Sequence, residues 1–188
     1  MFQPGTEWAY SMSIDVLGRV VEILSGMTLG EFMKKRIFDP LGMTDTAFHC
    51  SADKADRLAA LYVPNPADKK ILRNDAGAAG ALNEPKAHMG GGGLVSTTSD
   101  YLKFAEMLRG GGEYNGTRIL SNRTVAFMAS NHLPNNADLT ECGRPLFAET
   151  AFDGVGFGLS VSVTLDPVKA KVPGSAGDYG WGGAASTN

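Results

Sequence analysis

Two parts of this sequence, a tyrosine near the start and a glycine-rich end, hold residue types that could take part in chemistry. Only nine residues precede Tyr10. A free phenol has a pKa near 10, so a tyrosine works as a base at neutral pH only where cations favour the phenolate or where it relays a proton. Near the end, glycines gather between Gly174 and Gly183. Such clusters mark sharp turns and places where backbone approaches backbone or a ligand.

The sequence lacks the usual local motif of a serine nucleophile. No G-x-S-x-G occurs; residues 26–30 have that spacing with a threonine, Thr28, which we interpret as a helix cap. The one match to Ser-x-x-Lys joins Ser51 to Lys54, in a polar stretch between two strand-like runs. This short pattern is common by chance, so we do not assign it as catalytic.

Metal and nucleotide sites find no support in the motifs. His49, His88 and His132 lie far apart, without the spacing of metal ligands. No G-x-G-x-x-G follows a strand-like run, and no phosphate-binding G-x-x-x-x-G-K-[ST] occurs. The run of glycines at 90–93 could cradle an anion, but we favour a tight turn against the core.

Length and composition are those of a globular domain. The chain has 188 residues, 43% hydrophobic and 20% charged, enough for one real core. A net charge of −3 provides no basic field for nucleic acid or an anionic membrane. No run of roughly 18 apolar residues predicts a membrane span, and residues 1–8 do not resemble a secretory signal. The two cysteines, Cys50 and Cys142, fit neither a disulfide framework nor a zinc site.

The first half of the chain is predicted to be mainly helical. A helix ending at Gly26 has one stripe of apolar residues that we expect to be buried: Ile14, Leu17, Val20, Val21 and Leu24. Thr28 and Glu31 form a capping box for a second helix, which Pro40 is expected to end. Two short strand-like runs follow at 44–49 and 58–63, and residues 68–88 are expected to be a long irregular excursion.

The second half is predicted to pass from helices to strands. Capping residues at 96–100 start a helix with the stripe Tyr101, Phe104, Ala105 and Leu108, which Gly110 ends, and Ser121 caps the next helix. A polar loop is expected at 135–149. The alternation over 155–163 predicts one strand with a buried face, and residues 181–187 the next strand of the same antiparallel sheet. This order indicates the α+β class.

Four blocks together resemble serine hydrolases of the penicillin-binding-protein and class C β-lactamase type, nearest the family VIII carboxylesterases. The blocks are 2–18 (FQPGTEWAYSMSIDVLG), 40–46 (PLGMTDT), 90–101 (GGGGLVSTTSDY) and 177–184 (GDYGWGGA). The first is similar to that family's second motif region. The last is similar to its third motif, in which the esterases often have Trp-Gly-Gly where β-lactamases have Lys-Thr-Gly. The four blocks stand in family order across nearly the whole chain, which makes chance a poor explanation.

The resemblance implies a β-lactamase/transpeptidase-like fold and a role for each matched residue. The family's first motif, Ser-x-x-Lys, supplies a serine that attacks an ester or amide carbonyl. Tyr10 would be the base or proton shuttle. The backbone N–H of Ala184 would be one oxyanion donor, and Gly182 and Gly183 would let the acyl group lie along the strand without a Cβ clash. Such a site needs no metal or organic cofactor, and its partner would be a small ester or β-lactam-like molecule.

Two departures from the family pattern favour a carboxylesterase. Met12 stands where β-lactamases have the asparagine of Tyr-x-Asn, and Trp181 replaces the lysine that binds a β-lactam carboxylate; both would contact substrate. A β-lactamase or D-alanyl-D-alanine carboxypeptidase is the alternative within the class. A non-catalytic, ligand-binding relative is the alternative outside it, because the Ser-x-x-Lys motif that should precede Tyr10 is missing.

We therefore expect a fragment: residues 1–188 as one partial domain, with 1–150 mainly helix and loop and 151–188 the first strands of the sheet. Without its nucleophile, such a chain would be inactive alone. Relatives of this type occur in both cytoplasm and periplasm, so the sequence leaves the compartment open.

Overall fold

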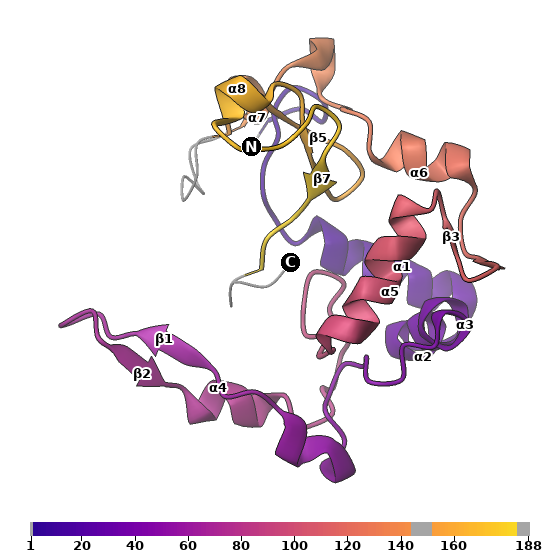
Figure 1. Ribbon diagram of the computed structural model, residues 1–188, viewed down its shortest axis with the longest axis vertical. Coiled ribbons are helices and arrows are strands. Elements are labelled where there is room, and N and C mark those ends of the chain that lie inside the picture. Colours follow the sequence, from indigo (N-terminus) through magenta and orange to yellow (C-terminus); the bar gives the residue numbers. More distant parts are fainter. Residues whose placement is uncertain (1, 144–151, 184–188) are drawn as a thin grey trace. The chain divides into compact units, whose positions relative to one another are not determined.

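The computed structural model describes residues 2–143 and 152–183, and these form two compact units (Figure 1). The first unit joins Met1–Ser11 to Leu120–Asn188, and the second is the continuous stretch Met12–Ile119. The division separates the segment around Tyr10 from the helix that follows it in the sequence. Each unit is described by itself.

Three helical segments follow one another at the start of the second unit. Helix α1 spans Ser13–Ser25 and ends at Gly26, whose φ is +68°, a left-handed conformation that glycine adopts without strain. Helix α2 (Leu29–Met33) begins at Thr28, and the predicted capping box with Glu31 is confirmed. The chain continues through a π-helical turn, η1 (Lys34–Phe38), into α3 (Asp39–Leu41).

The expectation that Pro40 ends this helix was wrong. Pro40 lies inside α3, at its first turn, and the helix ends at Gly42 with φ +68°. Proline is tolerated in the first turn of a helix because its missing N–H would have no partner there. In the π-helical turn just before α3, the Asp39 N–H donates to the Lys34 carbonyl, five residues earlier. This spacing interrupts the α-helical hydrogen-bond pattern, so α3 begins as a new helix.

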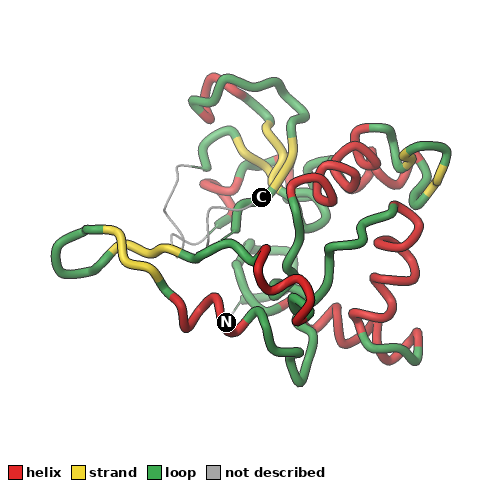
Figure 2. The backbone as a smooth tube through the Cα atoms, turned by 60° about the horizontal axis from the view of Figure 1, so that its bottom comes forward, coloured by secondary structure: helices red, strands yellow, loops and turns green. Residues whose placement is uncertain are grey.

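The middle of the chain is more regular than expected (Figure 2). After the 3-10 helix η2 (Ala52–Arg57), strands β1 (Tyr62–Pro64) and β2 (Ile71–Arg73) pair antiparallel, with Val63 opposite Leu72. Helix α4 (Asp75–Gly80) follows, so residues 68–88 are not the irregular excursion that the fading pattern predicted. Residues 44–49 form no strand and contribute one isolated bridge, from Ala47 to Val95.

The core of the second unit lies between the α2–α3 segment and helix α5 (Thr98–Arg109). Phe38, Leu41, Met43 and Met107 form the buried cluster, and Phe104 and Leu108 pack against it. Thr97 caps α5, as expected, by accepting a hydrogen bond from the Asp100 N–H. After α5, strands β3 (Glu113–Tyr114) and β4 (Thr117–Arg118) form a small hairpin.

Helix α1 does not bury its apolar stripe, contrary to expectation. Within α1 only Gly18 is buried, whereas Leu24 is 82% exposed. A Cβ at Gly18 would meet Leu29 at 3.0 Å and the Gly90 Cα at 3.3 Å, so helix and loop touch through glycine. Asp15 accepts the Gly91 N–H at 2.9 Å on the same side. The helix thus packs through its small and polar face, because glycine permits a closer approach than the aliphatic side would.

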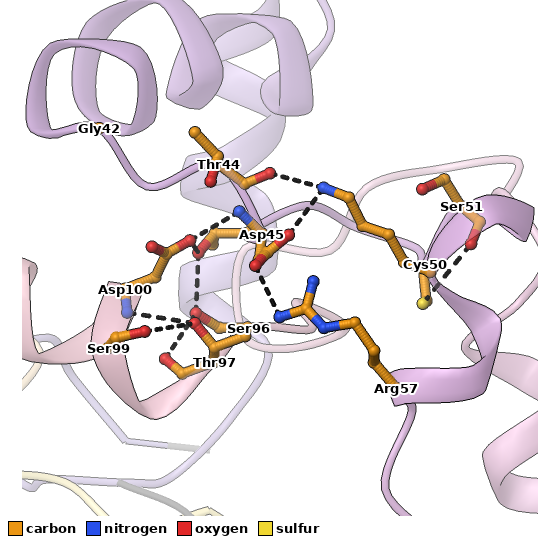
Figure 3. Close-up of polar contacts among 12 residues, drawn as sticks. Gly42, Thr44, Asp45, Cys50, Ser51, Arg57, Ser96, Thr97, Ser99 and Asp100 are labelled. Carbon is orange, nitrogen blue, oxygen red and sulfur yellow. Dashed lines mark hydrogen bonds and ion pairs between the residues drawn. The ribbon is translucent and has the colours of Figure 1, made fainter.

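A buried carboxylate ties the start of α5 to the loop after α3 (Figure 3). Asp100 is 2% exposed, and its Oδ2 accepts hydrogen bonds from the Asp45 N–H at 2.7 Å and the Thr46 hydroxyl at 3.1 Å. Its Oδ1 lies 2.9 Å from the Lys103 ammonium. The Thr46 hydroxyl also bonds to that of Ser96 at 2.7 Å. Asp100 belongs to the sequence block 90–101, and Asp45 and Thr46 belong to the block 40–46. The hydrogen bonds of this one side chain therefore join the two blocks.

The Asp45 side chain points out of this network into a second set of ion pairs. Lys54 lies 2.7 Å and Arg57 2.8 Å from its carboxylate oxygens, and Lys54 also donates to the Thr44 carbonyl. These hydrogen bonds, from Arg57 first and then Lys54, hold the pKa of the Asp45 carboxyl well below its usual range.

The first unit consists of short elements around a three-stranded antiparallel sheet in the order β5-β6-β7. The strands are β5 (Val155–Phe157), β6 (Ser162–Thr164) and β7 (Tyr179–Gly180), and the helices are α6 (Asn122–Met128), the 3-10 turn η3 (Pro134–Asn136), α7 (Leu139–Cys142) and α8 (Pro167–Ala170). Ser121 caps α6 as expected.

Two strand predictions in this unit were wrong in detail. The run 155–163 is a hairpin, with Gly156 opposite Val163, and not one strand. The alternation of apolar and small residues continues through the turn between β5 and β6. The sequence pattern therefore did not reveal that the chain reverses direction there. The last strand among the described residues is β7, and residues 181–183 come after it, outside any strand. The rest of the predicted strand 181–187 lies outside the described residues.

We predict that Asp100→Ala lowers the free energy of unfolding by about 3–5 kcal/mol, the usual cost of removing one partner of a buried ion pair. Urea unfolding followed by circular dichroism measures this. Glu106→Ala is the matched control, because Glu106 pairs with Arg109 at the surface of the same helix; we expect it to leave the unfolding midpoint nearly unchanged. Equal midpoints for the two variants would contradict a structural role for the buried carboxylate.

We predict that Asp45→Asn destabilises the chain at neutral pH and that this difference shrinks in acid. The folded-state pKa of Asp45 is depressed, so its stabilising effect is present above the unfolded-state pKa of about 4 and is lost as the pH falls below that value. Urea midpoints of wild type and variant across a pH series test this. A difference that persists undiminished well below pH 4 would show that the ion pairs are not its source.

Candidate active site

Five aromatic side chains gather in the first unit, and three of them, Trp8, Tyr10 and Trp181, come from the sequence blocks that resemble the family. Tyr10 and Trp181 stack with ring centroids 6.0 Å apart and planes 14° from parallel. Trp8 lies 6.2 Å from Trp181, and Phe157 meets Trp181 edge to face at 5.4 Å. Phe152 stacks on Trp181 at 6.4 Å. Trp181 therefore lies at the centre of an aromatic cluster that joins residues far apart in the sequence.

Backbone hydrogen bonds position the segment that carries Trp8 and Tyr10. The Trp8 N–H donates to the Cys142 carbonyl at 2.9 Å, and Trp8 bridges Gly143 in parallel fashion. Helix α7, which ends at Cys142, is held by Asp138, whose carboxylate accepts its own helix's Glu141 N–H and the Gly154 N–H at 2.9 Å. The start of the chain is thus attached to the turn that leads into β5.

The other half of the cluster is positioned by the sheet. The Phe157 N–H donates to the Asn131 side-chain oxygen at 3.0 Å, which fixes the end of β5. The Ser162 hydroxyl donates to the Gly180 carbonyl at 2.6 Å, so β7 is held immediately before Trp181. Burial raises the pKa of Tyr179, the other residue of β7, which keeps that phenol protonated at neutral pH.

The site predicted from sequence is assembled only in part among the described residues. Tyr10 is 49% exposed and stacks on Trp181. Gly182 is exposed, and a Cβ there would meet nothing within 4 Å. Gly183 is exposed as well, while Ala184, the expected oxyanion donor, lies outside the described residues. Met12 belongs to the second unit, where it precedes α1 and is 65% exposed.

The structure gives no catalytic role to the formal Ser-x-x-Lys match. Lys54 is bonded to Asp45 and to the Thr44 carbonyl, and its hydrogen bond with Asp45 raises its pKa. A lysine held protonated in this way cannot take a proton from a serine. The Ser51 hydroxyl is bonded to the Asp53 carboxylate, where it helps to lower the pKa of that carboxyl.

Two of the three histidines, His88 and His132, and the glycine run have local structural partners. His88 stacks on Phe48 at 4.3 Å and accepts the Gly30 N–H, and His132 is bonded to the Phe127 carbonyl. In the described ranges 2–143 and 152–183, no three metal-ligating side chains converge. The Gly91 N–H donates to the Asp15 carboxylate, so the glycine run is a turn against α1.

Among the described residues, no helix has both the length and the apolar composition that a membrane span requires.

Sequence reasoning missed three members of the cluster, Trp8, Phe152 and Phe157. A signal for Trp8 was present: it stands two residues before Tyr10, and in an extended segment such residues share a face. A pocket of about 490 Å³ in the second unit was missed too. Its lining includes Phe38, Phe48 and His88 but no serine, cysteine or tyrosine.

Comparisons with known proteins identify the family of this chain. The family model described as Beta-lactamase matches residues 1–188. Protein Rv1367c of Mycobacterium tuberculosis is 38% identical over 98% of this chain and 45% of its own length. A lovastatin esterase of Penicillium rubens is 37% identical over 89% of this chain and 43% of its own length. The chain therefore spans less than half the length of these relatives.

A solved structure shows the same fold. EstCE1, described as a hydrolase with promiscuous acyltransferase activity, superposes with a TM-score of 0.70 and 28% identity, over 94% of this chain and 45% of that one. The expected β-lactamase/transpeptidase-like fold is thereby confirmed, with its mixed helices and small antiparallel sheets. Since the family model matches the chain from its first residue to its last, the protein is a member of the Beta-lactamase family.

Proposed function

We propose that this chain supplies the tyrosine and Trp-Gly-Gly side of an active site that hydrolyses carboxylic esters through an acyl-enzyme. The observation that carries the proposal is the stacking of Tyr10 on Trp181 at 6.0 Å, immediately before the exposed Gly182 and Gly183. Two segments about 170 residues apart in the sequence meet there, and each bears a motif that resembles part of such a site. The esterase among the relatives supports the same activity.

Each residue has a distinct role in this proposal. Tyr10, half-exposed beside the cluster, accepts or relays the proton of the attacking hydroxyl. Gly182 and Gly183 leave open space in which an acyl group can lie along the backbone. The backbone N–H of Ala184 donates to the oxyanion, an interaction whose loss typically costs about 10²–10³ in rate. Aromatic rings around Trp181 give the acyl chain an apolar wall.

The proposed nucleophile is the serine of a Ser-x-x-Lys motif that precedes the tyrosine motif. In these 188 residues the one match to this pattern, Ser51 to Lys54, follows Tyr10 instead. In the step itself, the serine oxygen forms a bond to the ester carbonyl carbon, and the alcohol leaves with the proton that the serine gave up. Water then attacks the acyl-enzyme and releases the acid. Lys54 is held by Asp45, and Ser51 by Asp53, which leaves the chain without this first reactant.

An ester substrate is favoured over a β-lactam because the side chain at position 181 carries no positive charge. An anionic substrate requires a cation near its carboxylate, and the indole of Trp181 is uncharged and packed among aromatic rings. Small neutral esters with short acyl chains fit this wall better than a penicillin carboxylate would.

The 188-residue chain alone is predicted to hydrolyse no p-nitrophenyl butyrate and to take no fluorophosphonate label. Absorbance assays and peptide mass mapping measure these two outcomes. Turnover with the label on Ser51 would overturn the assignment of that segment as structural. Turnover with a label on any other serine would show that the order of motifs does not identify the nucleophile.

Ester binding can be tested without turnover, because Trp8 and Trp181 are the two tryptophans of the sequence and both lie in the cluster. We expect ethyl butyrate to change the tryptophan emission saturably, and Tyr10→Ala to weaken this binding about two- to tenfold, the value of one aromatic contact. Tyr62→Ala is the control, because Tyr62 lies in the β1–β2 hairpin of the second unit.

Benzylpenicillin provides the competing arm of this titration. Tighter binding of benzylpenicillin than of ethyl butyrate would favour the β-lactamase alternative. If neither molecule changes the emission of the wild-type chain, the cluster is not an acyl site and the proposal fails.

A further inference from the structure

Asp138 uses both of its carboxylate oxygens, and one of its hydrogen bonds reaches outside its own helix. Its Oδ1 accepts the Glu141 N–H at 3.0 Å and thereby caps the start of α7. Its Oδ2 accepts the Gly154 N–H at 2.9 Å, sixteen residues further along the chain and directly before β5. This partly buried side chain therefore joins α7 to the turn that leads into the sheet.

The backbone of Gly154 is held tightly in that turn. Its φ is +70°, and a Cβ there would meet the Asp166 carbonyl oxygen at 2.7 Å and the Lys169 Cβ at 2.8 Å. The Gly154 carbonyl accepts the Leu165 N–H at 2.8 Å and the Asp166 N–H at 3.0 Å. A group that bonds to the Gly154 N–H is therefore held at a set place relative to the sheet.

The other end of α7 holds the segment that carries Trp8 and Tyr10. The Cys142 carbonyl accepts the Trp8 N–H at 2.9 Å, and a Cβ at Gly143 would lie 3.8 Å from the Trp8 ring. Helix α7 is four residues long, so its two ends are about one helical turn apart. A shift at Asp138 therefore moves the backbone that binds Trp8.

We propose that Asp138 is a positioning residue of the acyl site, which fixes the spacing between the Trp8–Tyr10 segment and strand β5. Trp8 lies 5.1 Å from Phe157 of β5, and the two rings lie 6.2 Å and 5.4 Å from Trp181. The stacking of Tyr10 on Trp181 depends on the same spacing. This inference rests on the proposed ester hydrolysis, because it assigns Asp138 a task in that site.

The position of Asp138 requires a carboxylate. Burial raises the pKa of the Asp138 carboxyl, but hydrogen bonds from the Gly154, Glu141 and Thr140 N–H groups outweigh burial and leave that pKa below its usual value. The group is therefore charged at neutral pH. An amide has one acceptor oxygen, and its NH2 group would face an N–H donor on the other side. A carboxylate accepts on both sides and holds the helix and the turn at once.

Asp138→Asn separates the helix cap from the connection to the sheet. Asparagine caps helices about as well as aspartate, so its oxygen can keep the Glu141 N–H while the Gly154 N–H loses its partner. Asp138→Ser repeats the test, because serine is also a good cap and is too short to reach Gly154. Asp166→Asn is the matched control, because Asp166 caps the short helix α8 in the same unit. Circular dichroism verifies that all three variants are folded.

Two readouts distinguish positioning from a general loss of stability. The two tryptophans give two indole N–H signals in proton–nitrogen NMR spectra, and Trp8→Phe assigns them by removing one. We expect both Asp138 variants to shift the Trp8 signal and to weaken ethyl butyrate binding about three- to tenfold, because binding must then restore the geometry of the site. Asp166→Asn should change neither the signals nor the affinity.

Unshifted indole signals in both Asp138 variants would overturn the inference, as would an ester affinity equal to that of the wild type. An equal shift in Asp166→Asn would also overturn it, because any lost cap would then have the same effect. Failure of the proposed function gives a different result: the wild-type chain then binds no ester, which removes the acyl site, whereas a shifted Trp8 signal still shows that Asp138 positions the aromatic cluster.

Discussion

The second unit depends on the burial of one carboxylate, that of Asp100. A buried charge is tolerated only when its hydrogen bonds are satisfied, and Asp100 achieves this with the Asp45 N–H, the Thr46 hydroxyl and the Lys103 ammonium. Because those groups belong to the loop after α3 and to α5, the carboxylate fixes the distance between the two elements that enclose the core. The packing of Met107 in that core requires the same distance.

In the first unit the corresponding organising contact is aromatic. Trp181 lies against rings from the start of the chain, from β5 and from the residues before β5, so these short elements share one aromatic centre. Aromatic pairs stabilise such contacts by about 0.5–1.5 kcal/mol beyond the burial of area. The same packing brings Tyr10 beside the glycines that follow Trp181, which makes the structural centre and the proposed acyl site one and the same.

The four sequence blocks do not all contribute to the structure in the same way. Asp100 belongs to the block at 90–101, and the block at 40–46 supplies two of its partners, the Asp45 N–H and the Thr46 hydroxyl. In the blocks around Tyr10 and Trp181, Tyr10 is 49% exposed, and Gly182 and Gly183 are exposed. A set of motifs that resembles one family can thus consist of parts that bond to one another inside the fold and parts that stay at the surface, and the resemblance alone does not separate the two.

Features that depend on neighbouring residues could be predicted from the sequence. Helix caps at Thr28, Thr97 and Ser121 were predictable because a capping hydrogen bond spans only three residues. Family and fold class were predictable because four blocks stand in order. The outward orientation of the aliphatic side of α1 could not be predicted, because it follows from backbone contact at Gly18. The contact between Trp8 and Trp181 could not be predicted either, because no periodicity links residues so far apart in the chain.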